Sequence, residues 1–77
     1  MRPMNKAQKV IGACIRMMRE QHGLSQETLA AKAGISYQYL SGVENGKENF
    51  SIQVVESIAQ ALDLPLRTLI VSAYDGA

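Results

Sequence analysis

Apolar residues recur every three to four positions along almost the whole chain, which is the spacing that lines one face of an α-helix. No stretch alternates between apolar and polar residues as a half-buried strand does, so strand content should be near zero. Glycine, serine and proline interrupt the pattern at short intervals and divide it into five segments. The pattern therefore predicts an all-α fold, a compact bundle of five short helices.

Capping residues set the expected helix boundaries. Serine is a favoured N-cap, glycine a frequent helix stop, and proline suits a first helical turn. These preferences place helices at about 5–21, 25–34, 36–45, 51–62 and 65–75. Their apolar stripes are expected to build one core, which includes Met17 of the first helix and Ile52 of the fourth.

Residues 26–43 meet the requirements of a helix-turn-helix, in which two short helices cross through a tight turn. Ala30 supplies a small residue where the helices approach, and Gly34 supplies a turn residue that tolerates positive φ. Apolar residues are available to fill the elbow, namely Leu29, Ala33, Ile35, Leu40 and Val43. The alternative is a generic helical hairpin.

Composition and charge limit the number of domains, the cellular compartment and the partners that this chain can have. The 77 residues suffice for one domain, expected to span 1–77, and no apolar run approaches the ~18 residues of a membrane helix. The single Cys14 cannot form an internal disulfide, which favours the cytoplasm. The net charge is +1, but the first 19 residues hold five basic side chains and no acid: Arg2, Lys6, Lys9, Arg16 and Arg19. This basic end either meets a polyanion or is a solvated helix face.

Candidate catalytic and metal-binding residues are few. One cysteine and one histidine, Cys14 and His22, fall short of any zinc ligand set, and a core thiol beside a surface histidine is the simpler interpretation. No phosphate-binding loop, nucleophile elbow or pair of convergent carboxylates is present. We therefore expect no enzymatic activity, metal, cofactor or small-molecule ligand.

The motifs GLSQETLAAKAGIS, YLSGVENG and IAQAL follow one another between residues 23 and 62. In that order and spacing, the chain resembles the Cro and bacteriophage-repressor type of helix-turn-helix domain (the XRE family, lambda repressor-like) over roughly residues 11–70. The YLSGVE segment, residues 39–44, further resembles the controller proteins of restriction–modification systems.

The resemblance implies that the third helix enters the major groove of DNA and reads base edges. The matching positions are Ser36, Tyr37, Gln38, Tyr39 and Ser41. The Gln38 amide can pair with adenine, and the Tyr37 ring can contact a thymine methyl group. Gly42 is expected to permit close approach to DNA. For each of these residues the alternative is an ordinary solvent-exposed position.

The resemblance also implies phosphate contacts from the start of the second helix and from the loop after the third. The matching residues are Gln26, Asn45, Lys47 and Asn49. The chain departs from the family pattern where Asn45 and Glu48 stand in place of a frequent Arg, and Phe50 in place of a frequent Pro. A carboxylate facing DNA repels it, so we expect modest affinity per protomer.

Two further expectations concern structure and assembly. Arg19 and Glu44 match a family ion pair, which the resemblance implies anchors the recognition helix; the alternative is contact with DNA. The fifth helix, about 65–75, carries more apolar surface than one-sided packing requires, so it is expected to form a homodimer seam; the alternative is that it only caps the core. The expected seam residues are Leu66, Leu69, Ile70, Ala73 and Tyr74.

These observations predict a sequence-specific regulator of transcription that binds double-stranded DNA as a homodimer on a palindromic operator. It could be the controller of a restriction–modification system. The alternative is a protein-interaction module of the same fold, an antitoxin or a coactivator bridge.

Overall fold

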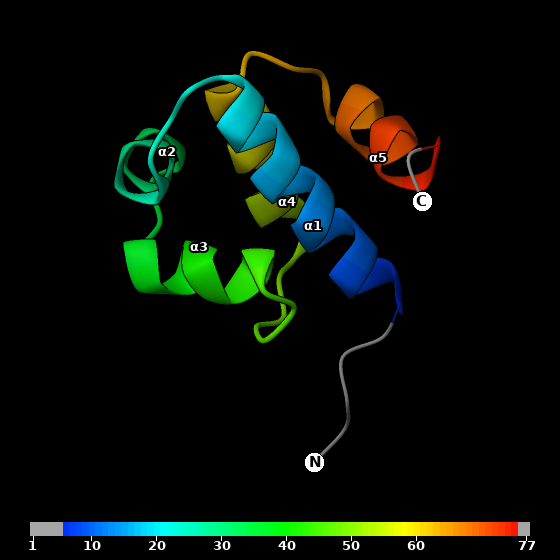
Figure 1. Cartoon of the computed structure of the whole chain (residues 1–77), viewed down its shortest axis with the longest axis horizontal. Coiled ribbons are helices and arrows are strands. Elements are labelled where there is room, and N and C mark those ends of the chain that lie inside the picture. The colour runs from blue at the N-terminus through cyan, green and yellow to red at the C-terminus, as the bar shows by residue number, and fades with distance from the viewer. Residues whose placement is uncertain (1–5, 76–77) are drawn as a thin grey trace.

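The computed structural model describes residues 6–75, and within that range it contains five α-helices and no strand. The helices are α1 (Lys6–Gln21), α2 (Gln26–Ala33), α3 (Tyr37–Glu44), α4 (Ile52–Ala61) and α5 (Leu66–Asp75) (Figure 1). The predicted all-α fold of five helices is therefore confirmed. Arg2 and the predicted first residue of the first helix, Asn5, lie outside the described residues.

Three serines begin helices as the sequence predicts. Each Oγ accepts a hydrogen bond from the backbone N–H three residues further on: Ser25 from Thr28 at 3.0 Å, Ser36 from Tyr39 at 3.0 Å, and Ser51 from Val54 at 3.2 Å. Each cap satisfies one N–H that a helix start leaves without a partner, and losing such a cap typically costs about 1 kcal/mol. The caps therefore define where α2, α3 and α4 begin.

The five helices enclose one apolar core. Helix α1 packs against α3 and α5, α2 against α3 and α4, and α4 against α5. Figure 1 shows α1 crossing the middle of the molecule between the α2–α3 pair and α5. The largest fully buried side chains are Ile15, Leu29, Leu40, Val43, Val55, Ile58, Leu62 and Leu69. Burial of a side chain of this size contributes about 1.5–3 kcal/mol, so this core is the main source of stability.

Two apolar residues that the helical periodicity places in the core lie outside it. Met17 of α1 is 44% exposed and Ile52 of α4 is 58% exposed. The prediction was wrong at both positions, because periodicity identifies the apolar side of a helix but not how much of that side its neighbours cover.

Helices α1 and α3 approach most closely at Gly12. A Cβ atom at this position would overlap the backbone carbonyl oxygen of Val43, so only glycine fits this crossing. Backbone atoms of the two helices are thus in contact, which places the end of α3 directly on α1. The sequence signal for this crossing is a glycine inside an otherwise helical pattern, a residue that usually has a packing reason.

Cys14 lies on α1 against α5. Its side chain is buried, its Sγ is 3.8 Å from the carbonyl oxygen of Leu69, and burial raises the pKa of the thiol. Because the thiolate is the reactive form, we expect a disulfide reagent to label Cys14 at least about 100-fold more slowly in the native protein than in denaturant. Equal rates in the two conditions would contradict this burial.

Candidate nucleic-acid interface

Helices α2 and α3 form the helix-turn-helix. Gly34 ends α2 with φ +74°, a left-handed conformation that favours glycine, and the next residue, Ile35, donates its N–H to the carbonyl of Ala30 at 3.0 Å. Ala30 and Leu29 are buried, and α3 begins three residues after Gly34, at Tyr37. The turn therefore sets the crossing of α2 and α3 through local backbone hydrogen bonds.

The first turn of α3 presents side chains to solvent. Ser36, Tyr37 and Gln38 are all exposed, and Tyr37 retains 43% of its accessible surface. Neither the Tyr37 phenol nor the Gln38 amide makes a hydrogen bond to another residue within the range 6–75. A rigid helix thus offers an amide and an aromatic ring outward, with their hydrogen-bonding capacity unused.

Tyr39 and Ser41, which were predicted to read bases as well, are held by the chain itself. The Tyr39 hydroxyl donates to the carbonyl of Asn49 at 2.7 Å, and burial, with a smaller effect of the Glu48 charge, raises the pKa of this phenol. Ser41 is half-buried, and the Asn45 amide donates to its carbonyl oxygen at 2.9 Å and to its Oγ at 3.5 Å. The donor hydrogen of Tyr39 is therefore used to position the loop after α3.

That loop folds back onto α3. The N–H groups of Lys47 and Glu48 both donate to the carbonyl of Gly42, at 2.8 and 3.2 Å. The side-chain oxygen of Asn49 accepts from the Gln8 amide at 2.6 Å, which ties the loop to the start of α1. The Asn45 donor and the Asn49 oxygen are thus engaged within the protein, whereas Lys47 is exposed.

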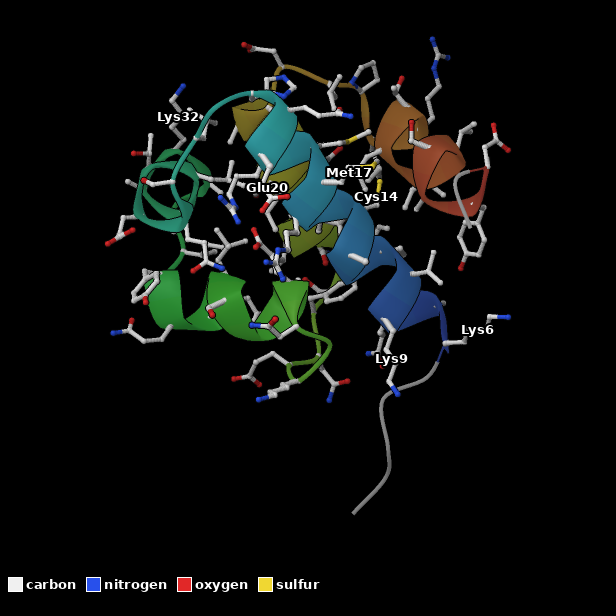
Figure 2. The ribbon with its side chains drawn as sticks, in the orientation of Figure 1. Lys6, Lys9, Cys14, Met17, Glu20 and Lys32 are labelled. Atoms are coloured by element: carbon white, nitrogen blue, oxygen red, sulfur yellow. The ribbon has the colours of Figure 1, made fainter. Side chains whose placement is uncertain are left out.

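A second lysine, Lys9, lies beside the loop that contains Lys47. Lys9 of α1 packs its side chain against Gly46, since a Cβ atom on Gly46 would lie 3.2 Å from the Lys9 Cγ. Figure 2 shows Lys9 on the side of α1 that faces the end of α3. Lys9 was not among the residues matched to the family's phosphate contacts, but it belongs to the basic N-terminal end for which contact with a polyanion was one of two interpretations. Its proximity to the loop follows from the α1–α3 crossing at Gly12.

A buried polar network lies behind the reading face (the exposed side of α3 that carries Tyr37 and Gln38). The Glu44 carboxylate accepts from Arg19 Nε at 2.8 Å, from Arg19 Nη2 at 3.1 Å and from the Gln26 amide at 3.1 Å. Arg19 Nη1 also donates to the carbonyl of Leu24 at 2.8 Å. The Glu44 side chain is 0% exposed and that of Arg19 is 11% exposed. The network joins the ends of α1 and α3 to the start of α2.

The charges of this network are compensated. The hydrogen bond to Glu44 raises the pKa of Arg19, against the opposing effect of burial, so the guanidinium stays charged. One N–H of the Gln26 amide donates to Glu44, and the amide has a second N–H. The predicted contact of Gln26 with a DNA phosphate stays a prediction, and it would use that second N–H or the backbone N–H groups at the start of α2.

The predicted dimer residues on α5 divide into two groups. Leu69 is 0% exposed and Ala73 is 4% exposed, so both belong to the core of the chain itself and cannot form a seam between chains. The prediction was wrong for these two, because α1 and α4 pack against α5 and both side chains lie in the common core. Leu66 and Ile70 are half-buried, and Tyr74 is 52% exposed. Val71, which was not predicted, is 55% exposed.

The described residues offer neither a metal site nor a membrane span. Nowhere in residues 6–75 do three His, Cys, Asp or Glu side chains gather in a way that could hold a metal ion. None of the five described helices is long and apolar enough to cross a bilayer.

Known proteins share both the sequence and the fold. The helix-turn-helix family model matches residues 15–69. The HTH-type transcriptional regulator SinR of Bacillus subtilis is 39% identical over 72 residues, which cover 87% of this chain and 65% of SinR. Control protein C.MunI of a Mycoplasma species is 37% identical over 54 residues, 70% of this chain and 73% of C.MunI. The crystal structure of the restriction–modification controller protein C.AhdI from Aeromonas hydrophila has a TM-score of 0.77 and 40% sequence identity, covering 80% of this chain and 94% of that chain.

The family match extends from the second half of α1 to the first turn of α5 and therefore contains the whole α2–α3 unit. The similarity to SinR extends further still, over most of the chain. This chain belongs to the helix-turn-helix family of transcriptional regulators.

Proposed function

We propose that this protein binds double-stranded DNA with α3 in the major groove and thereby regulates transcription. The observation that carries the proposal is the first turn of α3, where Tyr37 and Gln38 are exposed on a helix that the Arg19–Glu44 pair anchors from behind. A glutamine amide can pair with adenine N6 and N7, and a tyrosine ring offers an apolar edge to a thymine methyl group. The names of its relatives, which include a transcriptional regulator, a control protein and a restriction–modification controller protein, support the same function.

The phosphate contacts are assigned to groups that the structure leaves available. Lys47 lies in the loop after α3, and Lys9 lies beside that loop. The Asn49 oxygen accepts a hydrogen bond from Gln8, so the amide nitrogen of Asn49 is the group proposed to meet a phosphate. Such contacts position a protein on the duplex and make its affinity depend on salt. With few cations and with Glu48 in the same loop, affinity per protomer is expected to be modest.

The protein is proposed to act as a homodimer on a palindromic operator. One recognition helix covers only a few base pairs, whereas two helices related by a dyad read half-sites about 34 Å apart. Exposed apolar side chains for a seam are present on α5, at Val71 and Tyr74, and on the neighbouring α1, at Met17. These three residues replace the buried Leu69 and Ala73 as the proposed centre of the interface.

Selection from random double-stranded DNA tests this function. We expect enrichment of a sequence with two inverted half-sites, and binding that weakens steeply as salt is raised. Failure to enrich any sequence would contradict the proposal. Similarity to C.MunI and C.AhdI favours control of a restriction–modification system, and methyltransferase and endonuclease genes beside this gene would support that role.

Replacing Gln38 with alanine is expected to weaken binding to the selected site by about 1–3 kcal/mol, the value of one good base contact, with little effect on random DNA. Gel shifts on both DNAs measure the difference. Gln60→Ala is the matched control, because Gln60 is an exposed glutamine near the end of α4 that lies away from α3 (Figure 1). Equal losses on specific and random DNA would rule out base reading by Gln38.

A further inference from the structure

Gly42 leaves a vacant position on the reading face of α3. It lies four residues after Gln38, and residues so spaced share one face of a helix, one turn apart. From the sequence, this glycine is expected to leave room for DNA to approach. The structure shows that another part of the same chain occupies the room.

The occupant is the side chain of Glu48. A Cβ atom on Gly42 would overlap the Cγ of Glu48 and would lie 3.2 Å from its Cβ and 3.6 Å from its Cδ, the carboxyl carbon. The backbone N–H of Glu48 donates to the Gly42 carbonyl at 3.2 Å, and the Tyr39 hydroxyl holds the next residue, Asn49, at 2.7 Å. The loop thus places the Glu48 Cγ where the side chain of residue 42 would begin, with the carboxyl group next to that position.

This carboxylate is available for an external contact. Glu48 is exposed, and it makes no ion pair with any residue in the range 6–75. A carboxylate only accepts hydrogen bonds, and a DNA phosphate repels it. In the major groove the base donors are cytosine N4 and adenine N6, and the neighbouring N7 of adenine is an acceptor that opposes a carboxylate.

We propose that Glu48 is a specificity-determining residue that accepts a hydrogen bond from cytosine N4 and so supplies the side chain that Gly42 lacks. The proposal rests on the proposed function, because it needs α3 in the major groove. One helical turn advances about 5.4 Å and one base pair about 3.4 Å. The cytosine is therefore expected within about two base pairs of the base that Gln38 reads.

Parallel selections with the wild type, Glu48→Gln and Gly42→Ala test the proposal. Glutamine pairs with adenine, so Glu48→Gln is expected to change the preferred base from cytosine to adenine at one position of each half-site, a change of about 5- to 150-fold in relative affinity. The position that Gln38 reads is identified in the same way with Gln38→Ala. Glu56→Gln, which neutralises an exposed carboxylate on α4, is the charge-matched control and is expected to leave every base preference unchanged.

Gly42→Ala separates the placement of the carboxylate from its charge. The added methyl group displaces the Glu48 Cγ, and the Glu48 Cβ, 3.2 Å away, must move by a few tenths of an ångström. The net charge stays the same, and the higher helix propensity of alanine offsets the cost of this small shift. We expect this variant to lose the cytosine preference. In the Glu48→Gln background, the same change is expected to have no further effect on that preference, because both changes act through one carboxylate.

The outcomes distinguish the two proposals. A cytosine preference that Glu48→Gln leaves intact would overturn the reading role. A wild-type site with no cytosine near the base that Gln38 reads would also overturn it. So would a Glu48→Gln variant that gains affinity equally on every sequence, because Glu48 would then act only as a repulsive charge. If the wild type selects no sequence at all, the proposed function fails, and the role of Glu48 fails with it.

Discussion

Replacing Arg19 with alanine is expected to lower the free energy of unfolding by about 3–5 kcal/mol, the usual result of removing one partner from a buried ion pair. The change leaves the Glu44 carboxylate fully buried with only the Gln26 amide as a donor, and it removes the donor that the Leu24 carbonyl uses. Chemical denaturation measures the loss directly. In a domain of this size the melting temperature should fall by at least about 10 °C.

Arg16→Ala is the matched control on the same helix. Arg16 pairs with Glu20 at 3.5 Å, but both side chains are more than half exposed, and exposed pairs of this kind contribute less than about 1 kcal/mol. Similar small losses for the two variants would contradict the structural role of the buried pair. An unchanged melt of Arg19→Ala together with lost DNA binding would instead make Arg19 a DNA contact.

Leu69→Glu is expected to unfold the chain. Leu69 is fully buried in the core, and an unpaired carboxylate there costs several kcal/mol in addition to the lost apolar contacts. The total stability expected of 77 residues is only about 4–12 kcal/mol. Circular dichroism should show loss of the cooperative melt, and loss of DNA binding by this variant would say nothing about a dimer.

Val71→Glu is the variant that separates assembly from folding. Val71 is 55% exposed, so its replacement should keep the helical spectrum and the melt of a dilute sample. If α5 forms the dimer seam, sedimentation at micromolar concentration should show a dimer for the wild type and a monomer for Val71→Glu, with loss of operator binding. A wild type that sediments as a monomer, or a Val71→Glu variant that remains a dimer, would contradict the proposed seam.

The sequence was sufficient to predict the five helices but not which of their apolar side chains neighbouring helices would bury. Serine caps and Gly34 act through bonds within a few residues, so their roles can be predicted from the local sequence. Met17 and Leu69 show the opposite case. Both lie on apolar stripes, but their burial depends on the positions of helices distant in sequence, which leave Met17 exposed and bury Leu69 in the core.

In the candidate site, too, some features can be predicted from the local sequence and others depend on residues distant in the chain. Exposure of Tyr37 and Gln38 follows from their place in the first turn after a cap, which the sequence predicts. The roles of Tyr39, Gly42 and Gln26 depend on contacts with Asn49, Glu48 and Glu44, residues 6 to 18 positions away. Short-range periodicity contains no information on such pairs, because a loop can return to a helix from many directions.

The buried carboxylate of Glu44 has a consequence for how fast the protein could engage DNA. Because α1, α2 and α3 share this one acceptor, α3 cannot pivot relative to the other two helices without breaking charged hydrogen bonds in a dry interior. The reading helix is thus preorganised, and docking requires reorientation of surface side chains but no rearrangement of the backbone. Association on this scheme is governed by diffusion and electrostatic steering, and differences between DNA sequences arise in the lifetime of the complex.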